Sequence, residues 1–221
     1  MSTSPIVGHL DHIVLAAPDL LRACDDFERA TGVRPALGGA HPGLGTHNAL
    51  VSFDAGSYLE IIAPDPAQAG GGMARSLANL AQPAPLHWAI RVSALGDVVG
   101  RLRALGWNPS PIRRTTRTPP HGPKLEWDLC GLVNHNYGGI VPVFIDWLAS
   151  PHPAVNSPRV GALLSLDFAA PEPEPAQTLL TMFGISARIT RAPAAMAFRF
   201  ASPNGEIEFS GTAPRGFTLG N

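Results

Sequence analysis

The chain begins with a change of hydrophobic period that marks a strand followed by a helix. Residues 10–17, LDHIVLAA, form a short apolar and β-branched run that predicts a β-strand. The next segment, PDLLRACDDFERATG, spaces its apolar side chains three and four positions apart, which predicts an amphipathic helix ending at Gly32. Three extended segments follow, VRPALGGAHPGLGT, HNALVSFD and YLEIIAP, separated by glycine-bearing turns. The pattern therefore predicts a β-α-β-β-β module.

The same order of elements returns from residue 86. LHWAIRV predicts a strand, and LGDVVGRLRALG predicts an amphipathic helix. PSPIRRTTR, KLEWDLCGL and IVPVFIDWL then predict three more strands. A third, shorter copy begins with LLSLDFAAPEPEPAQTLLTMFG and closes with an Asn204-Gly205 hairpin. The repetition predicts three modules of decreasing completeness.

The repeats set the expected domain organisation and fold class. We expect one domain over residues 8–150, made of modules 8–66 and 85–150, and a third β-α-β-β-β module over residues 158–212. The segments between the modules are rich in proline, glycine and alanine, which is typical of linkers. The fold class expected is α+β.

Composition and charge narrow the classes of function. The chain carries 16 basic and 17 acidic residues, a formal charge of -1, which offers no electrostatic surface to a nucleic-acid backbone or an anionic membrane. The longest uncharged run, residues 129–145, contains polar side chains and Pro142, so it does not predict a membrane span. Two cysteines build no disulfide framework, and no signal peptide is visible. We expect a cytoplasmic protein with a small-molecule partner, and the odd third module suggests a homodimer.

Aligning the modules by hand brings polar residues into equivalent places. LDHIVLAAPDL and PLHWAIRVSAL superpose His12 on His87, each on the first strand of its module. YLEIIAP and FIDWLASP superpose Glu60 on Asp146, each on the last strand. The third module keeps only the acid, Glu208.

Tandem β-α-β-β-β modules with a histidine on the first strand and an acid on the fourth resemble the vicinal oxygen chelate superfamily, which includes glyoxalase I, extradiol dioxygenases and bleomycin-resistance proteins. LDHIVLAAPDL, GGAHPGLGTHNAL, YLEIIAPDP and FIDW resemble its glyoxalase-like domain branch. The resemblance implies two curled mixed sheets that face each other to form a cup holding a divalent metal. It also implies the ligand positions His12, Glu60, His87 and Asp146, although Asp146 is one methylene shorter than the glutamate usual there.

The physics of a strand supports the same site. Alternate residues share a face, so Glu60 lies with Tyr58 and Ile62, and Asp146 lies with Phe144 and Leu148. A lone ionised carboxylate on such an apolar face costs several kcal/mol unless a cation or donors compensate. Imidazole and carboxylate ligands suit Zn, Fe, Mn, Ni or Co, and the ligand types do not choose among these metals. The alternative for each residue is an ordinary pairing with an arginine or a backbone donor.

Other residues are weaker candidates. His41 and His47 flank a glycine-rich turn, and His41 is a candidate general base because its pKa is normally near neutral. Asn48 starts a strand expected to line the cup. Arg113, Arg114 and Arg117 form a cluster that would suit a substrate carboxylate or phosphate, or would simply face solvent. The segment NHNYGG, residues 134–139, is either a lid or a polar turn. Trp147 alternates away from Asp146 and is expected to pack under a helix.

The expected function is a metal-dependent enzyme of lyase or isomerase type. In it the metal chelates two adjacent substrate oxygens and stabilises an enediolate or similar oxyanion. Asp146 serves as a fourth ligand or as the base. If Asp146 does not bind metal, two histidines and one carboxylate resemble the triad of non-haem Fe(II) oxygenases, and an extradiol-type dioxygenase becomes the alternative. A metal-free protein that binds or sequesters a small molecule is the remaining alternative.

Overall fold

The structure, a computed structural model, describes residues 8–54, 56–119 and 122–212. The first part of the chain follows the predicted order: β1 (His9–Ala16), α1 (Leu20–Thr31), β2 (Ala36–His41), β3 (Thr46–Phe53) and β4 (Tyr58–Pro64). Asp19 caps the start of α1 by accepting a hydrogen bond from the Arg22 backbone N–H, and Gly32 ends the helix at φ 79.

The next part repeats this order. It comprises β5 (Ala84–Arg91), α3 (Leu95–Ala104), β6 (Arg113–Arg117), β7 (Leu125–Cys130) and β8 (Val143–Asp146), with short 3-10 turns η1 (Gly138–Ile140) and η2 (Pro153–Val155) on either side of β8. The segment between the two parts was predicted to be a linker only. It contains a helix, α2 (Gly72–Ala78), because Ala74 and Leu77 are buried on one of its faces.

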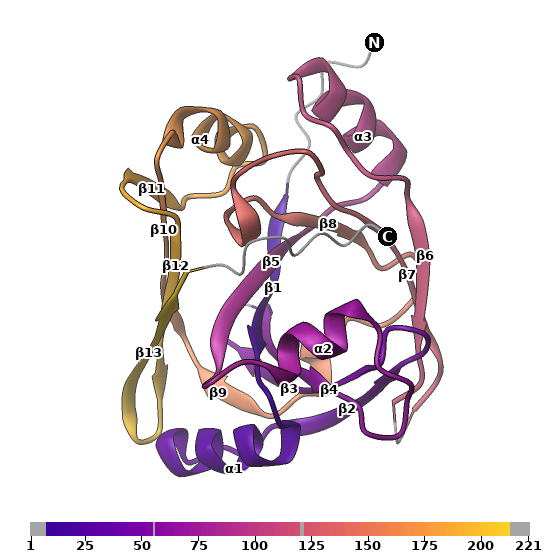
Figure 1. Ribbon diagram of the computed structural model, residues 1–221, viewed down its shortest axis with the longest axis vertical. Coiled ribbons are helices and arrows are strands. Elements are labelled where there is room, and N and C mark those ends of the chain that lie inside the picture. The colour runs from indigo at the N-terminus through magenta and orange to yellow at the C-terminus, as the bar shows by residue number, and fades with distance from the viewer. Residues whose placement is uncertain (1–7, 55, 120–121, 213–221) are drawn as a thin grey trace.

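The strands of both parts join in one mixed sheet. Their order is β2-β3-β4-β1-β5-β8-β7-β6, with β9 (Arg159–Gly161) added beside β3. β1 lies at the centre, parallel to β4 and antiparallel to β5. The sheet curls until β2 and β6, its two ends, lie against each other, which gives a nearly closed barrel (Figure 1). The prediction of an α+β fold with a curled mixed sheet is confirmed.

The last part of the chain forms a second sheet. β10 (Leu163–Ala170), α4 (Pro173–Met182), β11 (Arg188–Arg191), β12 (Ala195–Ser202) and β13 (Gly205–Gly211) give the strand order β11-β10-β12-β13. This sheet stands beside the curled sheet and above α1 in Figure 1. Phe200 of β12 packs against Phe27 of α1 and Phe53 of β3. None of the helices in the described ranges is long and apolar enough to cross a membrane.

Strand alternation divides the curled sheet into two faces. The outer face packs against α1, α3 and the second sheet in one continuous apolar core. The inner face carries a separate cluster that includes Tyr58, Trp127, Ile145 and Trp147. α2 lies across the opening of the curled sheet (Figure 1), and its Leu77 packs with inner-face residues. The inner face of the curled sheet therefore lines a cavity that α2 partly covers.

Candidate functional site

Glu60 of β4 is a buried carboxylate on the wall of the inner cavity. Leu59 and Ile61 point into the outer core, whereas Tyr58, Glu60 and Ile62 line the cavity, as strand alternation predicts. Only 9% of Glu60 is exposed. A carboxylate buried this deeply needs hydrogen-bond donors or positive charge around it.

His12 of β1 faces the same cavity, with its ring held by Asp11. His12 Nδ1 lies 2.6 Å from Asp11 Oδ1. The same carboxylate, fully buried, accepts hydrogen bonds from Trp147 Nε1 at 2.9 Å and His152 Nε2 at 3.0 Å. Because the carboxylate accepts a hydrogen bond from Nδ1–H, the other ring nitrogen, Nε2, points toward Glu60 Oε2, 3.7 Å away.

A β-bulge explains how neighbouring residues Asp11 and His12 both reach the interior. Side chains alternate along a regular strand, so Asp11 would point away from His12. The register of β1 against β5 shifts between Leu10 and His12, and this irregularity turns both side chains inward. Asp11 was not predicted as a site residue, since no sequence pattern marks the bulge.

Asn48 connects the other side of Glu60 to His41 and Arg117. Its Nδ2 atom donates to Glu60 Oε1 at 2.7 Å and lies 3.2 Å from His41 Nε2. Its Oδ1 atom accepts a hydrogen bond from Arg117 Nη1 at 3.0 Å. His41 Nδ1 in turn lies 3.0 Å from Thr46 Oγ1. Both ring nitrogens of His41 are therefore engaged, which makes this residue a support for Asn48 and Glu60.

These contacts fix the charge state of the site. Burial alone raises the pKa of Glu60, but His41, His12, the Asn48 hydrogen bond and Arg117 together lower it below its usual value. Burial lowers the pKa of His41 despite the opposing charge of Glu60. Burial likewise raises the pKa of Asp11, but His12 and His152 more than reverse this and lower it. At neutral pH both carboxylates are ionised and His41 is neutral.

His87 of β5, the predicted counterpart of His12, lines the same cavity as His12 and Glu60. It pairs across the sheet with Val14, two residues after His12 on β1. Burial, followed by the proximity of His12, lowers the pKa of His87 to about 4, with Glu60 opposing. Its imidazole is therefore neutral at pH 7.

Asp146 is not brought together with the other three predicted ligands. Val14 pairs with Glu60 in the first part, and the equivalent residue Ala89 pairs with Val143 in the second. Val143, rather than Asp146, thus occupies the place equivalent to Glu60. The hand alignment was displaced by three residues, an odd number, which reverses the face. Asp146 Oδ1 instead accepts the Leu148 backbone N–H at 3.0 Å.

Trp147 takes the inward position that the sequence assigned to Asp146. It was predicted to pack under a helix, but it lines the cavity and packs on Trp127 with ring centroids 5.1 Å apart. Its indole N–H holds Asp11. Trp147 therefore forms part of the cavity wall and helps to position Asp11, the carboxylate partner of His12.

The cavity is small and mostly apolar. Its volume is about 90 Å³, and α2 narrows it by inserting Met73 among the lining residues. The polar groups in its wall gather around Glu60 and along β6, where Thr115 and Arg117 face inward. Such a space suits a compact substrate with a few polar atoms.

The imidazole and carboxylate groups in this cavity are of the types that bind divalent metal ions. His12 Nε2 and Glu60 Oε2, 3.7 Å apart, are close enough for one ion to contact both at bond lengths of about 2.0–2.2 Å. Asp11 orients His12 as carboxylates commonly orient metal-bound histidines. Within the described ranges, however, no group of three or more His, Cys, Asp or Glu side chains is arranged to hold an ion. The arrangement thus supplies two ligands directly and has His87 nearby.

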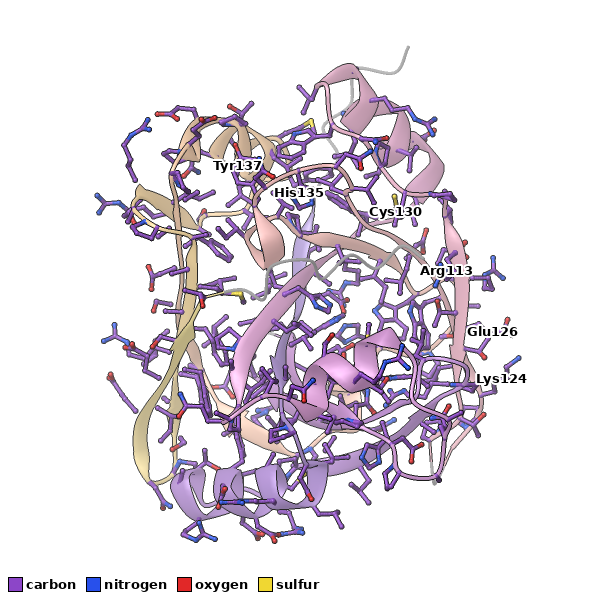
Figure 2. All side chains as sticks on the ribbon, viewed as in Figure 1. Arg113, Lys124, Glu126, Cys130, His135 and Tyr137 are labelled. Atoms are coloured by element: carbon purple, nitrogen blue, oxygen red, sulfur yellow. The ribbon has the colours of Figure 1, made fainter. Side chains whose placement is uncertain are left out.

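Two of the three arginines of the predicted cluster lie outside this cavity. Arg114 pairs with Asp128, and Figure 2 shows Arg113 at the outer edge of the molecule beside β6 and β7, together with Lys124 and Glu126. The 134–139 segment is no lid over Glu60, because His135 and Tyr137 lie toward α4, where Tyr137 Oη donates to the Glu172 carbonyl at 3.0 Å (Figure 2).

The chain is similar to one protein family and to several solved structures. The glyoxalase-like domain family matches residues 10–183. A hypothetical protein from Staphylococcus aureus is similar in structure, with a TM-score of 0.60 and 14% identity over 95% of this chain and 87% of that one. Methylmalonyl-CoA epimerase from Mycobacterium tuberculosis gives a TM-score of 0.48 and 22% identity over 70% of this chain and 96% of its own. No curated protein sequence gives a significant match.

Proposed function

Because this chain belongs to the glyoxalase-like domain family of the vicinal oxygen chelate superfamily, we propose that it is an enzyme of isomerase or lyase type that moves a proton on a small substrate. The substrate carries two adjacent oxygens and sits in the inner cavity. One observation carries the proposal: the buried, ionised Glu60 faces this cavity between His12 and His41, 3.7 and 3.6 Å from its two oxygens.

Glu60 is the proton-transferring group in this proposal. Its lowered pKa keeps it ionised at neutral pH, and Asn48 occupies Oε1, which leaves Oε2 directed toward the cavity. The carboxylate removes a proton from the substrate carbon adjacent to a carbonyl group. It then returns the proton to the same carbon or to the neighbouring carbon. His12, oriented by Asp11, offers Nε2 at the same place. His41 holds Asn48 and acts as a positioning residue.

A divalent cation is the proposed cofactor. His12 and Glu60, with His87 as the third donor, are the residues that would hold it, and it would supply Lewis acidity to the two substrate oxygens. Metal analysis of protein purified without chelator tests this part separately. We expect close to one equivalent of a transition metal per chain, lost in His12→Ala. Less than about 0.2 equivalents after reconstitution, with an unchanged melting temperature, would remove the cation from the proposal.

Solvent exchange tests the proton transfer. Protein in D₂O is incubated with a panel of compounds bearing adjacent oxygens, including dihydroxyacetone and 2-oxobutyrate, and exchange of hydrogen at the carbon next to the carbonyl is followed by NMR. We expect Glu60→Gln to slow exchange by about 100-fold or more, because the amide cannot accept the proton. Glu126→Gln, an outer carboxylate paired with Lys124, is the matched control and should exchange at the wild-type rate. Equal exchange by wild type and Glu60→Gln would refute the assignment.

A ring-cleaving dioxygenase is the second candidate, and one observation favours it. With Asp146 directed away, the predicted ligands that still line the cavity are two histidines, His12 and His87, and one carboxylate, Glu60, which are the ligand types of non-haem Fe(II) oxygenases. Oxygen consumption with catechol and Fe²⁺ separates the two enzymes. A metal-free binding protein predicts instead that Glu60→Gln leaves ligand affinity nearly unchanged and that no exchange occurs with wild type.

A further inference from the structure

Arg117 is a buried cation on the cavity wall that has no ion-pair partner among the described residues. Only 4% of the residue is exposed, and its side chain lines the cavity that holds Glu60. It donates a hydrogen bond to the neutral amide of Asn48 at 3.0 Å. Among the described residues it takes part in no ion pair, whereas Arg114 on the same strand pairs with Asp128 at 2.6 Å. A guanidinium has five N–H donors, so most of its binding capacity remains for a ligand.

Gly38 of β2 lies directly against the Arg117 guanidinium. A Cβ atom at Gly38 would lie 2.0 Å from Arg117 Nη1 and 2.2 Å from Asn48 Oδ1. The β2 backbone therefore covers the Arg117–Asn48 hydrogen bond so closely that a side chain at position 38 would force Arg117 or Asn48 to shift. This packing keeps Arg117 inside the barrel, near the cavity, in place of the solvent-directed position usual for a long cationic side chain.

Thr115 supplies an independent sign of a ligand. It lies two residues before Arg117 on β6 and lines the same cavity, because alternate residues share a face. Its Oγ1 atom is buried and has no hydrogen-bond partner among the described residues. A buried hydroxyl without a partner is uncommon in native proteins and calls for an explanation. Thr115 and Arg117 thus present an unused hydroxyl and an unpaired guanidinium to one space.

We propose that Arg117, assisted by Thr115, binds a carboxylate group of the substrate, so that the substrates are small 2-oxo or 2-hydroxy acids. A carboxylate accepts two parallel hydrogen bonds from a guanidinium. One of its oxygens and the neighbouring oxo or hydroxyl oxygen form the adjacent pair that the proposed function requires. A single cationic group in a cavity of about 90 Å³ suits a compact monoanion better than a phosphate. The inference rests on the proposed function for the reaction but not for the binding.

The competing explanation is that Arg117 only balances Glu60. Asn48 links the two groups, donating to Glu60 Oε1 while it accepts from Arg117 Nη1. In that case Arg117 would support the fold and the pKa of Glu60 without preferring an anionic ligand. A comparison of a charged ligand with its neutral analogue separates the two explanations.

Calorimetric titration with 2-oxobutyrate and 2-oxobutyramide, which differ in the carboxylate alone, tests the inference at pH 7 and fixed ionic strength. We expect the wild type to bind the acid at least tenfold more tightly than the amide. Arg117→Gln should reduce this preference to threefold or less, and Thr115→Val should weaken acid binding severalfold. Arg114→Gln, an outward arginine on the same strand, is the control and should bind as the wild type does.

Three results would overturn the inference: equal affinity of the wild type for acid and amide, no acid binding at 10 mM, or unchanged preference in Arg117→Gln. If Arg117→Gln does not fold, Arg117→Lys and Thr115→Val decide, since lysine keeps the charge but loses the paired donors and should weaken acid binding. Glu60→Gln separates this inference from the proposed function. If the preference for the acid depends on Arg117 but no hydrogen exchange occurs in D₂O, only the proposed proton transfer is refuted. If the wild type exchanges hydrogen on 2-oxobutyrate and Arg117→Gln does so at the same rate, only the carboxylate anchor is refuted.

Discussion

At the scale of single residues, Asp11 sets the orientation of the His12 ring in the cavity. Asp11 is fully buried and accepts from three donors, which belong to His12, Trp147 and His152. The network joins β1 to the segment after β8, and its carboxylate fixes the proton of His12 on Nδ1. A fully satisfied buried network of this kind specifies one arrangement of its members.

Asp11→Asn is expected to destabilise the protein by about 3 kcal/mol. The amide N–H₂ group is a donor, so it would face other N–H donors at a position where a carboxylate oxygen accepts their hydrogen bonds. Urea unfolding at pH 7 measures the change. Asp25→Asn is the control, because Asp25 pairs with Arg34 at an exposed site, and it should unfold as the wild type does. Equal midpoints for Asp11→Asn and the wild type would contradict the role given to Asp11.

The site could be predicted from the sequence only where strand alternation holds. YLEIIAP is a regular strand, so its pattern correctly turns Glu60 inward. Asp11 was missed because a bulge interrupts the alternation of β1. Asp146 and Trp147 were exchanged because sequence similarity between YLEI and FIDW does not fix a register. Only the pairing of Ala89 with Val143 fixes it, and that pairing is a tertiary contact.

At the scale of elements, the curled sheet closes where β2 approaches β6. Gly39 has φ +120, and a Cβ atom there would lie 2.7 Å from the Thr118 carbonyl oxygen. The register of β2 against β3 shifts between Leu37 and Gly39, which bends β2 toward β6. Three glycines of this glycine-rich segment, Gly39, Gly43 and Gly45, have positive φ, so they serve backbone conformation. The close contact of β2 with β6 at Gly39 could not be predicted, because it depends on which strands become neighbours.

Gly39→Ala is expected to cost about 3 kcal/mol of unfolding free energy, since it adds a clash to the strain of a positive φ. Gly43→Ala isolates the strain, because Gly43 has φ +79 and its Cβ would meet nothing within 4 Å; we expect about 1 kcal/mol there. Chemical unfolding of both variants gives the comparison. If the two substitutions cost the same, close contact at Gly39 is not what closes the sheet.

At the scale of the whole molecule, the third β-α-β-β-β segment shares its core with the first. The order of elements along all three segments was predictable, because the hydrophobic period changes from two to about 3.6 and back in each. How the third segment packs was not predictable from a repeat pattern. In the structure Phe200 is fully buried, and its ring centroid lies 5.9 Å from that of Phe27 and 5.6 Å from that of Phe53.

Because the outer core runs without a break from β1 to β12, the chain is expected to unfold in a single transition. Phe200→Ala should lower the unfolding free energy of the whole chain by about 3–5 kcal/mol and keep one transition. Phe209→Ala removes a partly exposed ring that stacks on Phe198 and Phe200 within the second sheet, and should cost about 1–2 kcal/mol. Calorimetry measures both. A Phe200→Ala profile that splits into two transitions, with the first belonging to residues 158–212, would mean that this segment folds on its own and only rests against the curled sheet.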